Sequence, residues 1–217
     1  MLTTINFLGA DVALTKTFTM SGGKLIKSAY PNVRDFTSFS FRIQSIQEFF
    51  NILIEQASKG NCLLKGTLQR KLVMESRAGS TASDAATQWV CLDIDAAEVE
   101  NITDITDHIP GLKDVSHIVQ YSSSYGIAGS KKLSAHVLFL LDKPLPPDVL
   151  KAWLMEANLC KSAIRRHIGL TKTAAYLHWP IDITACQNDK LLYISPPVLV
   201  GNVPCDITPG ERFKFVL

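Results

Sequence analysis

The sequence predicts a mixed α/β or α+β fold, because strand-like and helix-like segments intermingle along its 217 residues. Apolar residues make up 47% of the chain and charged residues 19%, which supplies a core and excludes a disordered chain. The length suits one large domain or one domain of two lobes. Some neighbouring strands can pair directly, which argues against a helical bundle or a sandwich.

The first part of the chain contains one strong helix signal. Residues 20–35, which include two glycines and a proline, predict an irregular, partly basic segment. Ser45-Ile46-Gln47-Glu48 has the form of a capping box, and helix-spaced apolar residues follow it up to a stop at Gly60. Cys62–Leu64 predicts a short buried strand, and Ser76–Ser83 a polar loop.

Three strands are expected in the middle of the chain. Trp89–Ile94 reads as a buried strand, and a weaker helix is expected over Ala96–Ile109, ending at Pro110-Gly111. His117–Tyr121 predicts a second strand, and Leu133–Leu141 gives the clearest strand signal of all.

The last part predicts helices and then short strands. Pro146-Pro147 opens a helix whose inner face is expected to carry Val149, Leu150, Trp153, Leu154 and Ala157. A shorter helix is expected from Lys161 to Gly169. Short strands are expected at Ile181–Ile183 and Leu191–Ile194.

Several classes of protein are excluded by composition. The five scattered cysteines form no C-x-x-C pair, which indicates reduced thiols in a cytoplasm and gives no zinc knuckle. No apolar stretch approaches the roughly 20 residues of a membrane-spanning helix. Met1 to Leu14 carries no Lys or Arg, so the basic start of a secretory signal is missing.

The charges are distributed unevenly, although the net charge is only +2. Residues 91–128 carry seven acidic side chains and one basic one, whereas residues 1–90 and 129–172 have net charges of +4 and +5. This pattern fits either ordinary solvated faces or a metal-binding carboxylate centre between surfaces that hold phosphates.

Asp93 and Asp95 form the first site with chemical content. Residues i and i+2 share one face of a strand, so both carboxylates point the same way at the end of an apolar run. Two such carboxylates repel each other unless a cation lies between them, and Mg²⁺ prefers oxygen ligands. The alternative is a strand-to-helix turn in which Asp95 caps the following helix.

The second site is the alternating set Lys132, Ser134 and His136. The same period of two places the cation, the hydroxyl and the imidazole on one strand face, which suits phosphate oxygens, while the other face is apolar. A core histidine bonded to the backbone is the alternative. The third site is Asp182, which interrupts an apolar run; taken alone, it reads as a turn residue.

In this order, D-x-D, K-x-S-x-H and an apolar residue before Asp resemble the archaeo-eukaryotic primase superfamily. The closest likeness is to the primase-polymerase (PrimPol) catalytic domains of phages and plasmids, over roughly residues 60–200. The resemblance implies a two-lobed fold of about residues 1–90 and 91–217. The second lobe would carry the motifs on an RRM-like sheet.

The resemblance implies a DNA primase-polymerase, a nucleotidyltransferase that makes or extends primers in phage or plasmid replication. Asp93, Asp95 and Asp182 would hold two Mg²⁺ or Mn²⁺ ions, in a catalytic set that also includes His136. Lys132, Ser134 and His136 would bind the incoming dNTP or NTP. Lys190 is a weaker candidate for that task, and Ser122–Ser124 either line the nucleotide pocket or form a simple loop.

Single-stranded DNA is the expected template partner. Its phosphates would be contacted by four basic residues: Arg77, Lys161, Arg165 and Arg166. The alternative for the last three is an exposed basic helix. We expect no membrane partner and a bacterial or archaeal host cytoplasm. The zinc module that many members of this family carry has no counterpart in this sequence. The resemblance also implies a helicase, either as a partner or as another domain of a longer primase-helicase to which this chain belongs.

Rival functions remain open from the sequence. A replication-initiator nuclease needs an H-x-H pair, and His136 has no histidine at position 134 or 138. A single-stranded DNA-binding module would leave the acidic pair without a role. A metal-dependent nuclease could use the same three acids, although the row of Lys, Ser and His suits a triphosphate better.

Overall fold

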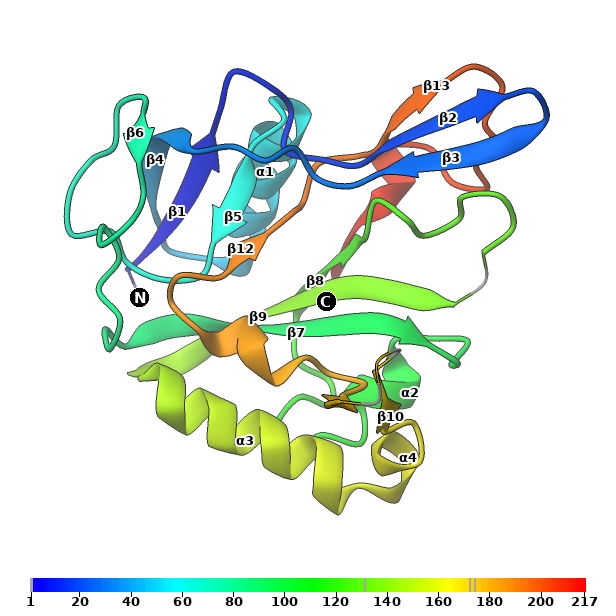
Figure 1. The fold of residues 1–217 in the computed structure, drawn as a ribbon. Coiled ribbons are helices and arrows are strands. Elements are labelled where there is room, and N and C mark those ends of the chain that lie inside the picture. The colour runs from blue at the N-terminus through cyan, green and yellow to red at the C-terminus, as the bar shows by residue number, and fades with distance from the viewer. Residues whose placement is uncertain (1, 131, 172, 174) are drawn as a thin grey trace.

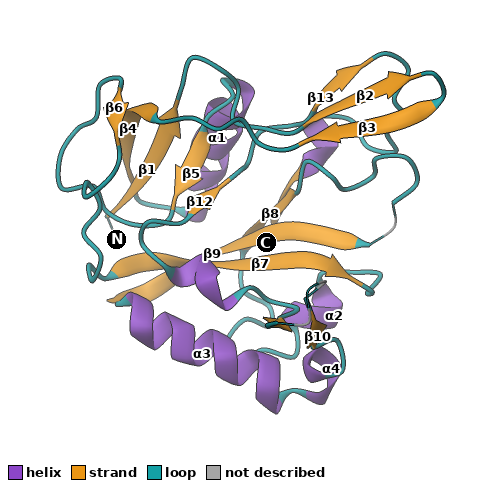
Figure 2. Cartoon of the chain, in the orientation of Figure 1, coloured by secondary structure: helices purple, strands orange, loops and turns teal. Residues whose placement is uncertain are grey.

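The computed structural model describes residues 2–130, 132–171, 173 and 175–217. It shows a mixed α+β protein built mostly of strands, with few helices (Figures 1 and 2). The strands are β1 (Thr3–Gly9), β2 (Thr17–Ser21), β3 (Lys24–Ser28), β4 (Asp35–Ile43), β5 (Cys62–Leu64), β6 (Glu75–Ser76), β7 (Thr87–Ala97), β8 (His117–Tyr121), β9 (Leu133–Leu145), β10 (Gly169–Leu170), β11 (Leu177–His178), β12 (Leu191–Leu192), β13 (Val198–Val200) and β14 (Phe213–Val216). The helices are α1 (Ile46–Ser58), α2 (Thr103–Thr106), α3 (Pro147–Cys160) and α4 (Ser162–Arg165), with short 3₁₀ turns η1 (Ile183–Cys186) and η2 (Gly210–Arg212).

A four-stranded antiparallel sheet in the order β14-β8-β9-β7 is the centre of the second half of the chain. Strand β9 lies between β7 and β8, so β7, α2 and β8 form a split βαβ arrangement with β9 inserted. Helix α3 runs beneath this sheet in Figure 1.

The first half of the chain forms a five-stranded sheet in the order β12-β5-β1-β4-β6, packed with α1. Strand β12 comes from the second half of the chain and joins the two halves by pairing with β5. A three-stranded sheet, β13-β2-β3, projects at the upper right of Figure 1, and its β13–β2 pair is parallel. Strands β10 and β11 form a small hairpin.

The central sheet is buried on both faces over much of its length. One face, with Val90, Leu92, Val137 and Phe139, packs against α3 and its neighbours. The other face, with Trp89, Cys91, Ile118 and Leu138, packs against α1 and the first-half sheet. Because alternate residues of a strand point to opposite faces, strands buried on both sides read as continuous apolar runs.

The strongest sequence signals are confirmed. Helix α1 begins after Ser45, whose hydroxyl accepts a hydrogen bond from the Glu48 amide at 3.1 Å. The expected strands at Cys62–Leu64 and His117–Tyr121 match β5 and β8, and those at Trp89–Ile94 and Leu133–Leu141 lie inside longer strands. The helix opened by Pro146-Pro147 is α3.

Other expectations are wrong. Residues 20–35 are not irregular throughout, because the β2–β3 hairpin turns at the two glycines, Gly22 and Gly23, both with positive φ. Of the helix expected over Ala96–Ile109, only the short helix α2 forms, because β7 continues as a strand to Ala97. As a result, Asp95 caps no helix and belongs to the strand.

The end of the chain also differs from expectation. The helix expected from Lys161 to Gly169 is only the single turn α4, and β12 stops at Leu192. Ile181 makes only an isolated bridge to Ile94, and η1 follows it in place of the expected strand. On α3, Val149 is 45% exposed, so it does not belong to the inner face. None of the helices in the described ranges is long and apolar enough to cross a membrane.

Candidate active site

The face of the central sheet that meets the first half of the chain changes from apolar to polar along its strands. On β7, Trp89 and Cys91 are followed on the same face by Asp93 and Asp95. On the antiparallel strand β9, Leu138 is likewise preceded by His136 and Ser134. The polar end of this face therefore collects the side chains of the first two sequence motifs.

Asp93, His136 and Gln120 form one row across three strands, because His136 is the register partner of both other residues. Gln120 donates its amide to the Tyr121 carbonyl, so its Oε1 must face His136 Nδ1, 2.6 Å away. The neutral imidazole therefore carries its proton on Nδ1. Its bare Nε2 lies 3.4 Å from Asp93 Oδ1, so two hydrogen-bond acceptors face each other.

The electrostatics of this row are unusual. Burial, and then the charge of Asp182, raise the pKa of Asp93 to about 6. Desolvation, followed by repulsion from Asp93, raises the pKa of Asp95. Burial lowers the pKa of His136 to about 4, which keeps the ring neutral near pH 7. A cation placed among these acceptors would relieve the repulsion between them.

A bulge at the end of β7 positions Asp95. The β7–β9 register shifts between Ile94 and Ala97, and Ala96 has a positive φ of 49°. The amide of Ala96 donates to the Ser134 hydroxyl at 2.9 Å, which ties the bulge to β9. The Ser134 hydroxyl therefore accepts from the backbone and keeps its own O–H as a donor.

Asp182 lies beside this row, because its amide donates to the Asp93 carbonyl at 2.8 Å. Both of its carboxylate oxygens have partners: Oδ1 accepts from the Thr184 amide, and Oδ2 from the Thr184 hydroxyl and from Lys190 Nζ, each at 2.8 Å. Burial alone would raise the pKa of Asp182, but these hydrogen bonds lower it overall. Burial lowers the pKa of Lys190, but the hydrogen bond to Asp182 and the charges of Asp182, Asp93 and Asp95 together raise it overall.

Two residues from the first half of the chain, Lys16 and Tyr30, also reach the site, and no periodic pattern in the sequence marks either of them. Lys16 donates to the Ser124 hydroxyl at 3.2 Å and lies over the ring of Tyr30. Burial lowers the pKa of Lys16, while the charges of Asp95 and Asp93 oppose that shift. Tyr30 in turn stacks on Tyr193 with ring centroids 3.7 Å apart.

The serines at 122–124 form a wall of the site rather than an unattached loop. Arg212, itself buried, donates to the Ser122 carbonyl at 2.6 Å and holds this segment in place. The hydroxyl of Ser123 is buried. It lies close enough to the Tyr30 hydroxyl to oppose the rise that burial causes in the pKa of Tyr30.

Lys132 stands apart from the expected phosphate cradle. Its Nζ pairs with Glu98 at 2.9 Å, and the lysine side chain is 59% exposed. It lines a hollow of about 380 Å³ with Asp95 and Arg166, so Arg166 is the expected DNA-binding residue that comes nearest to the carboxylates. Lys161 precedes the α4 turn, and Arg165 is exposed on that turn. Arg77 lines a different pocket, beyond β12.

The residues present fit a divalent cation only in part. Asp93 and Asp95 supply the hard oxygen ligands that Mg²⁺ or Mn²⁺ requires, and a bound cation would offset the burial and repulsion that raise their pKa values. Asp182 is engaged by Lys190 and Thr184. Among the described residues, no group of three or more His, Cys, Asp or Glu side chains is arranged to hold a metal ion. A three-carboxylate site would require Asp182 to release Lys190.

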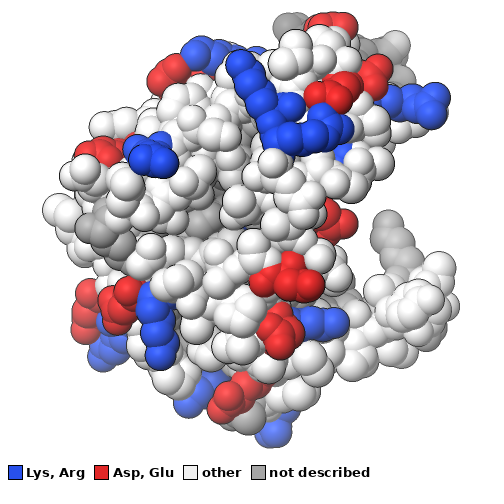
Figure 3. Space-filling view, turned by 90° about the vertical axis from the view of Figure 1, so that its left-hand side faces the viewer, with Lys and Arg blue, Asp and Glu red and all other residues white. Residues whose placement is uncertain are grey.

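The surface view shows the outline hollowed on its right-hand side, with acidic side chains beside the hollow and basic side chains gathered above (Figure 3). No family model, no curated protein and no solved structure matches this chain. The fold and the geometry of the site define a mixed α+β protein with a carboxylate cluster between its two halves. The resemblance to primases rests on the motif residues themselves.

Proposed function

We propose that this chain is a template-directed nucleotidyltransferase of the primase-polymerase type. The observation that carries the proposal is the grouping of Asp93, Asp95 and Asp182 with His136 at the polar end of the central sheet. Lys16 and Lys190 supply positive charge on either side. This grouping unites three short motifs that lie far apart in the sequence.

The arrangement of the sheet supports the proposal. The order β7, α2, β8, β9 and α3 is followed by Ile181, which bridges Ile94 of β7, so the last segment of a βαββαβ order lies beside its first strand, while β14 is an additional strand on the β8 edge. We propose that it corresponds to the RRM-like sheet expected of this class, and that residues 1–90 form the opposing lobe. A sheet of this kind serves many functions, so the argument for activity depends on the side chains.

The chemistry asked of the protein in such a reaction is mainly positioning and charge stabilisation. Asp93 and Asp95 would hold a divalent cation, which supplies positive charge to the attacking hydroxyl and the triphosphate. Lys190 and Lys16 place ammonium groups where they can receive phosphate oxygens. The neutral His136, fixed by Gln120, presents a bare Nε2 towards Asp93, where it can accept a hydrogen bond or bind a cation but cannot donate to a phosphate oxygen.

The test is a synthesis assay with single-stranded DNA template, labelled nucleotides and Mn²⁺ or Mg²⁺, with and without a primer. The Asp93→Asn/Asp95→Asn variant keeps side-chain shape and removes both charges. An Asp107→Asn/Asp142→Asn variant removes two exposed carboxylates and serves as the matched control. We expect metal-dependent products from wild type and control and none from the first variant; unprimed products would add primase activity.

Two other outcomes would each point to a rival function. Shortening of the DNA, lost in the Asp93→Asn/Asp95→Asn variant, would indicate a metal-dependent nuclease. No synthesis in either metal, together with DNA binding that the variant leaves unchanged, would indicate a single-stranded DNA-binding module. Either result overturns the polymerase proposal.

A further inference from the structure

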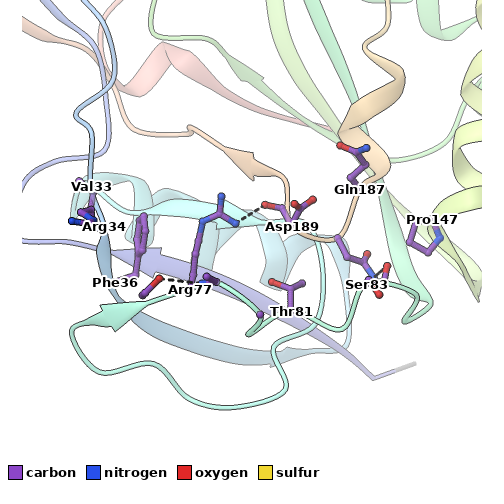
Figure 4. Close-up of a pocket in the computed structure, with 13 residues that line it drawn as sticks. Val33, Arg34, Phe36, Arg77, Thr81, Ser83, Pro147, Gln187 and Asp189 are labelled. Atoms are coloured by element: carbon purple, nitrogen blue, oxygen red, sulfur yellow. Dashed lines mark hydrogen bonds between the residues drawn. The ribbon is translucent and has the colours of Figure 1, made fainter.

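A pocket of about 700 Å³ lies on the other side of β12 from the carboxylates. Its walls come from four parts of the chain that are distant in sequence: Val33, Arg34 and Phe36, the loop 76–83, Pro147, and residues 187–189. Figure 4 shows Arg77 reaching from the loop towards Asp189, with Phe36 and Arg34 on one side and Thr81 and Ser83 on the other. The volume is in the range of small-molecule sites, about 300–1,000 Å³.

The charge of the pocket favours an anion. Arg34 and Arg77 are its two cations, and Asp189 is its one acidic lining residue. Arg77 donates one guanidinium nitrogen to the Asp189 carbonyl at 3.0 Å, and neither arginine takes part in an ion pair with any described residue. Most of their hydrogen-bond donors therefore remain available for a phosphate.

The loop that carries Arg77 is held at both ends. The Ser80 hydroxyl is buried and donates to the Arg77 carbonyl at 2.7 Å. Further along, the buried amide of Asn188 donates to the carbonyls of Ala82 and Ala85, both at 2.8 Å. The pocket is thus built before any ligand arrives, which reduces the entropy that binding must overcome.

Two contacts connect the pocket with the carboxylate site. Asp189 lines the pocket, while its neighbour Lys190 turns to the other side and pairs with Asp182. Burial raises the pKa of Tyr193, and Arg77 is close enough to oppose this rise. Tyr193 stacks on Tyr30. Burial raises the pKa of Tyr30, and the charge of Asp93 lies close enough to raise it further. A nucleic-acid strand that crosses the stacked tyrosines would reach both places.

We propose that this pocket holds a nucleotide unit of the single-stranded template, with its phosphate on Arg34 and Arg77 and its polar edges on the hydroxyls of Thr81 and Ser83. The inference rests on the proposed function and extends it by assigning a strand-binding site outside the carboxylate cluster. The ligand is a unit of a strand rather than a free nucleotide, because Asp189 lines the pocket while its neighbour Lys190 pairs with Asp182, so the pocket lies next to the carboxylate site where the template is copied.

The experiment measures binding of a fluorescein-labelled oligothymidylate by anisotropy over a series of salt concentrations, without divalent metal. We expect Arg34→Ala and Arg77→Ala each to weaken binding about tenfold, the loss of one charge-assisted contact. Each should also reduce the salt slope by about 0.7, the value for one phosphate on a single strand. Asp189→Asn should strengthen binding, because it removes the acidic lining group and keeps the backbone carbonyl that Arg77 uses.

Arg70→Ala is the matched control, since Arg70 pairs with Glu75 and lines a different hollow. Thermal melts of each variant establish folding, and Arg34→Ala removes a side chain exposed at the rim, so it tests the pocket even if Arg77→Ala unfolds. A template with 4-thiothymidine should crosslink to the loop 76–83.

The outcomes separate this inference from the proposed function. Binding by Arg34→Ala and Arg77→Ala equal to that of Arg70→Ala would overturn the pocket assignment, whether or not the protein synthesises DNA. Displacement of the oligonucleotide by free thymidine monophosphate at equal nucleotide concentration would replace the strand site with a mononucleotide site and also overturn it. If both arginine variants lose strand binding but the wild-type protein makes no DNA, the pocket assignment stands and the polymerase proposal is rejected.

Discussion

Nδ1 of His136 lies 2.6 Å from Oε1 of Gln120, and this contact fixes the tautomer of a buried imidazole. Gln120 is fully buried, and its amide is oriented by the Tyr121 carbonyl. The glutamine therefore acts as a positioning residue: it sets which nitrogen of His136 faces Asp93.

The first prediction concerns this tautomer. In nitrogen-15 NMR spectra near pH 7, wild-type His136 should appear as a neutral ring protonated on Nδ1. Gln120→Leu removes the acceptor, so the ring should shift towards the Nε2–H form, which can donate to Asp93. If the proposed activity is present, its rate should fall about 10- to 100-fold, as for other groups that orient a site residue. An Nε2–H ring in the wild type would contradict the assignment.

The second prediction concerns Asp93. The folded-state pKa is raised to about 6 from 3.8, so in the metal-free protein this carboxylate makes stability fall as pH rises between those values. Asp93→Asn should therefore stabilise the metal-free protein at pH 7, by about 1–3 kcal/mol. Mn²⁺ should raise the melting temperature of the wild type and not of the variant. Calorimetry with and without Mn²⁺ measures both effects; an equal Mn²⁺ shift in the two proteins would exclude Asp93 as a ligand.

The third prediction concerns Lys190, which occupies one oxygen of Asp182 at 2.8 Å. Lys190→Met leaves only the Thr184 hydroxyl on that oxygen and removes a cation, so Mn²⁺ affinity should rise several-fold. The KM for nucleotide should rise about tenfold, because one phosphate contact is lost. Lys132→Met is the control, since Lys132 is exposed and pairs with Glu98. Titration calorimetry measures the Mn²⁺ affinity, and steady-state kinetics measures the KM for nucleotide. A fall in the affinity for Mn²⁺ as well as for nucleotide would show that Lys190 does not compete with Mn²⁺ for Asp182.

The fourth prediction concerns Lys65, which is fully buried, donates to the Thr87 hydroxyl and lies over the Trp89 ring. Burial lowers its pKa from 10.5 to about 8. The unfolded chain therefore binds more protons between these values, and the stability contribution of Lys65 rises with pH across this window. Lys65→Met should be more stable than wild type at pH 7, by about 1–3 kcal/mol, and should lack this rise. Urea unfolding at pH 7 and pH 10 tests both statements.

The fifth prediction concerns the start of α1. Ser45→Ala removes the hydroxyl that accepts from the Glu48 amide, so the free energy of unfolding should fall by about 1 kcal/mol. Ser45→Asp keeps an acceptor and should restore most of the loss. Chemical unfolding of the three proteins provides the measurement, and equal stability of Ser45→Ala and wild type would show that the cap is not used.

Local signals predicted the elements whose own residues suffice to specify them. Helix α1 follows from its cap at Ser45 and its apolar spacing, and β8 and β9 follow from short apolar runs. The signals failed where pairing decides the structure. In the β2–β3 hairpin every residue of β3 is exposed and Phe18 is the one buried residue of β2, so no apolar pattern marks it. Strand β7 contains a bulge at Ala96, after which the chain leaves the sheet, and no local sequence pattern predicts this bulge.

The candidate site divides in the same way. The sequence by itself determined that Asp93 and Asp95 share a face and that Ser134 and His136 share another, because a strand repeats every two residues. Only the tertiary structure decided that the two faces are one, through the pairing of Asp93 with His136 across β7 and β9. It also decided that Lys16 and Tyr30 face the acids and that Lys190 occupies Asp182. Most of these contacts join residues tens of positions apart, and they depend on how the two sheets pack, which no local pattern encodes.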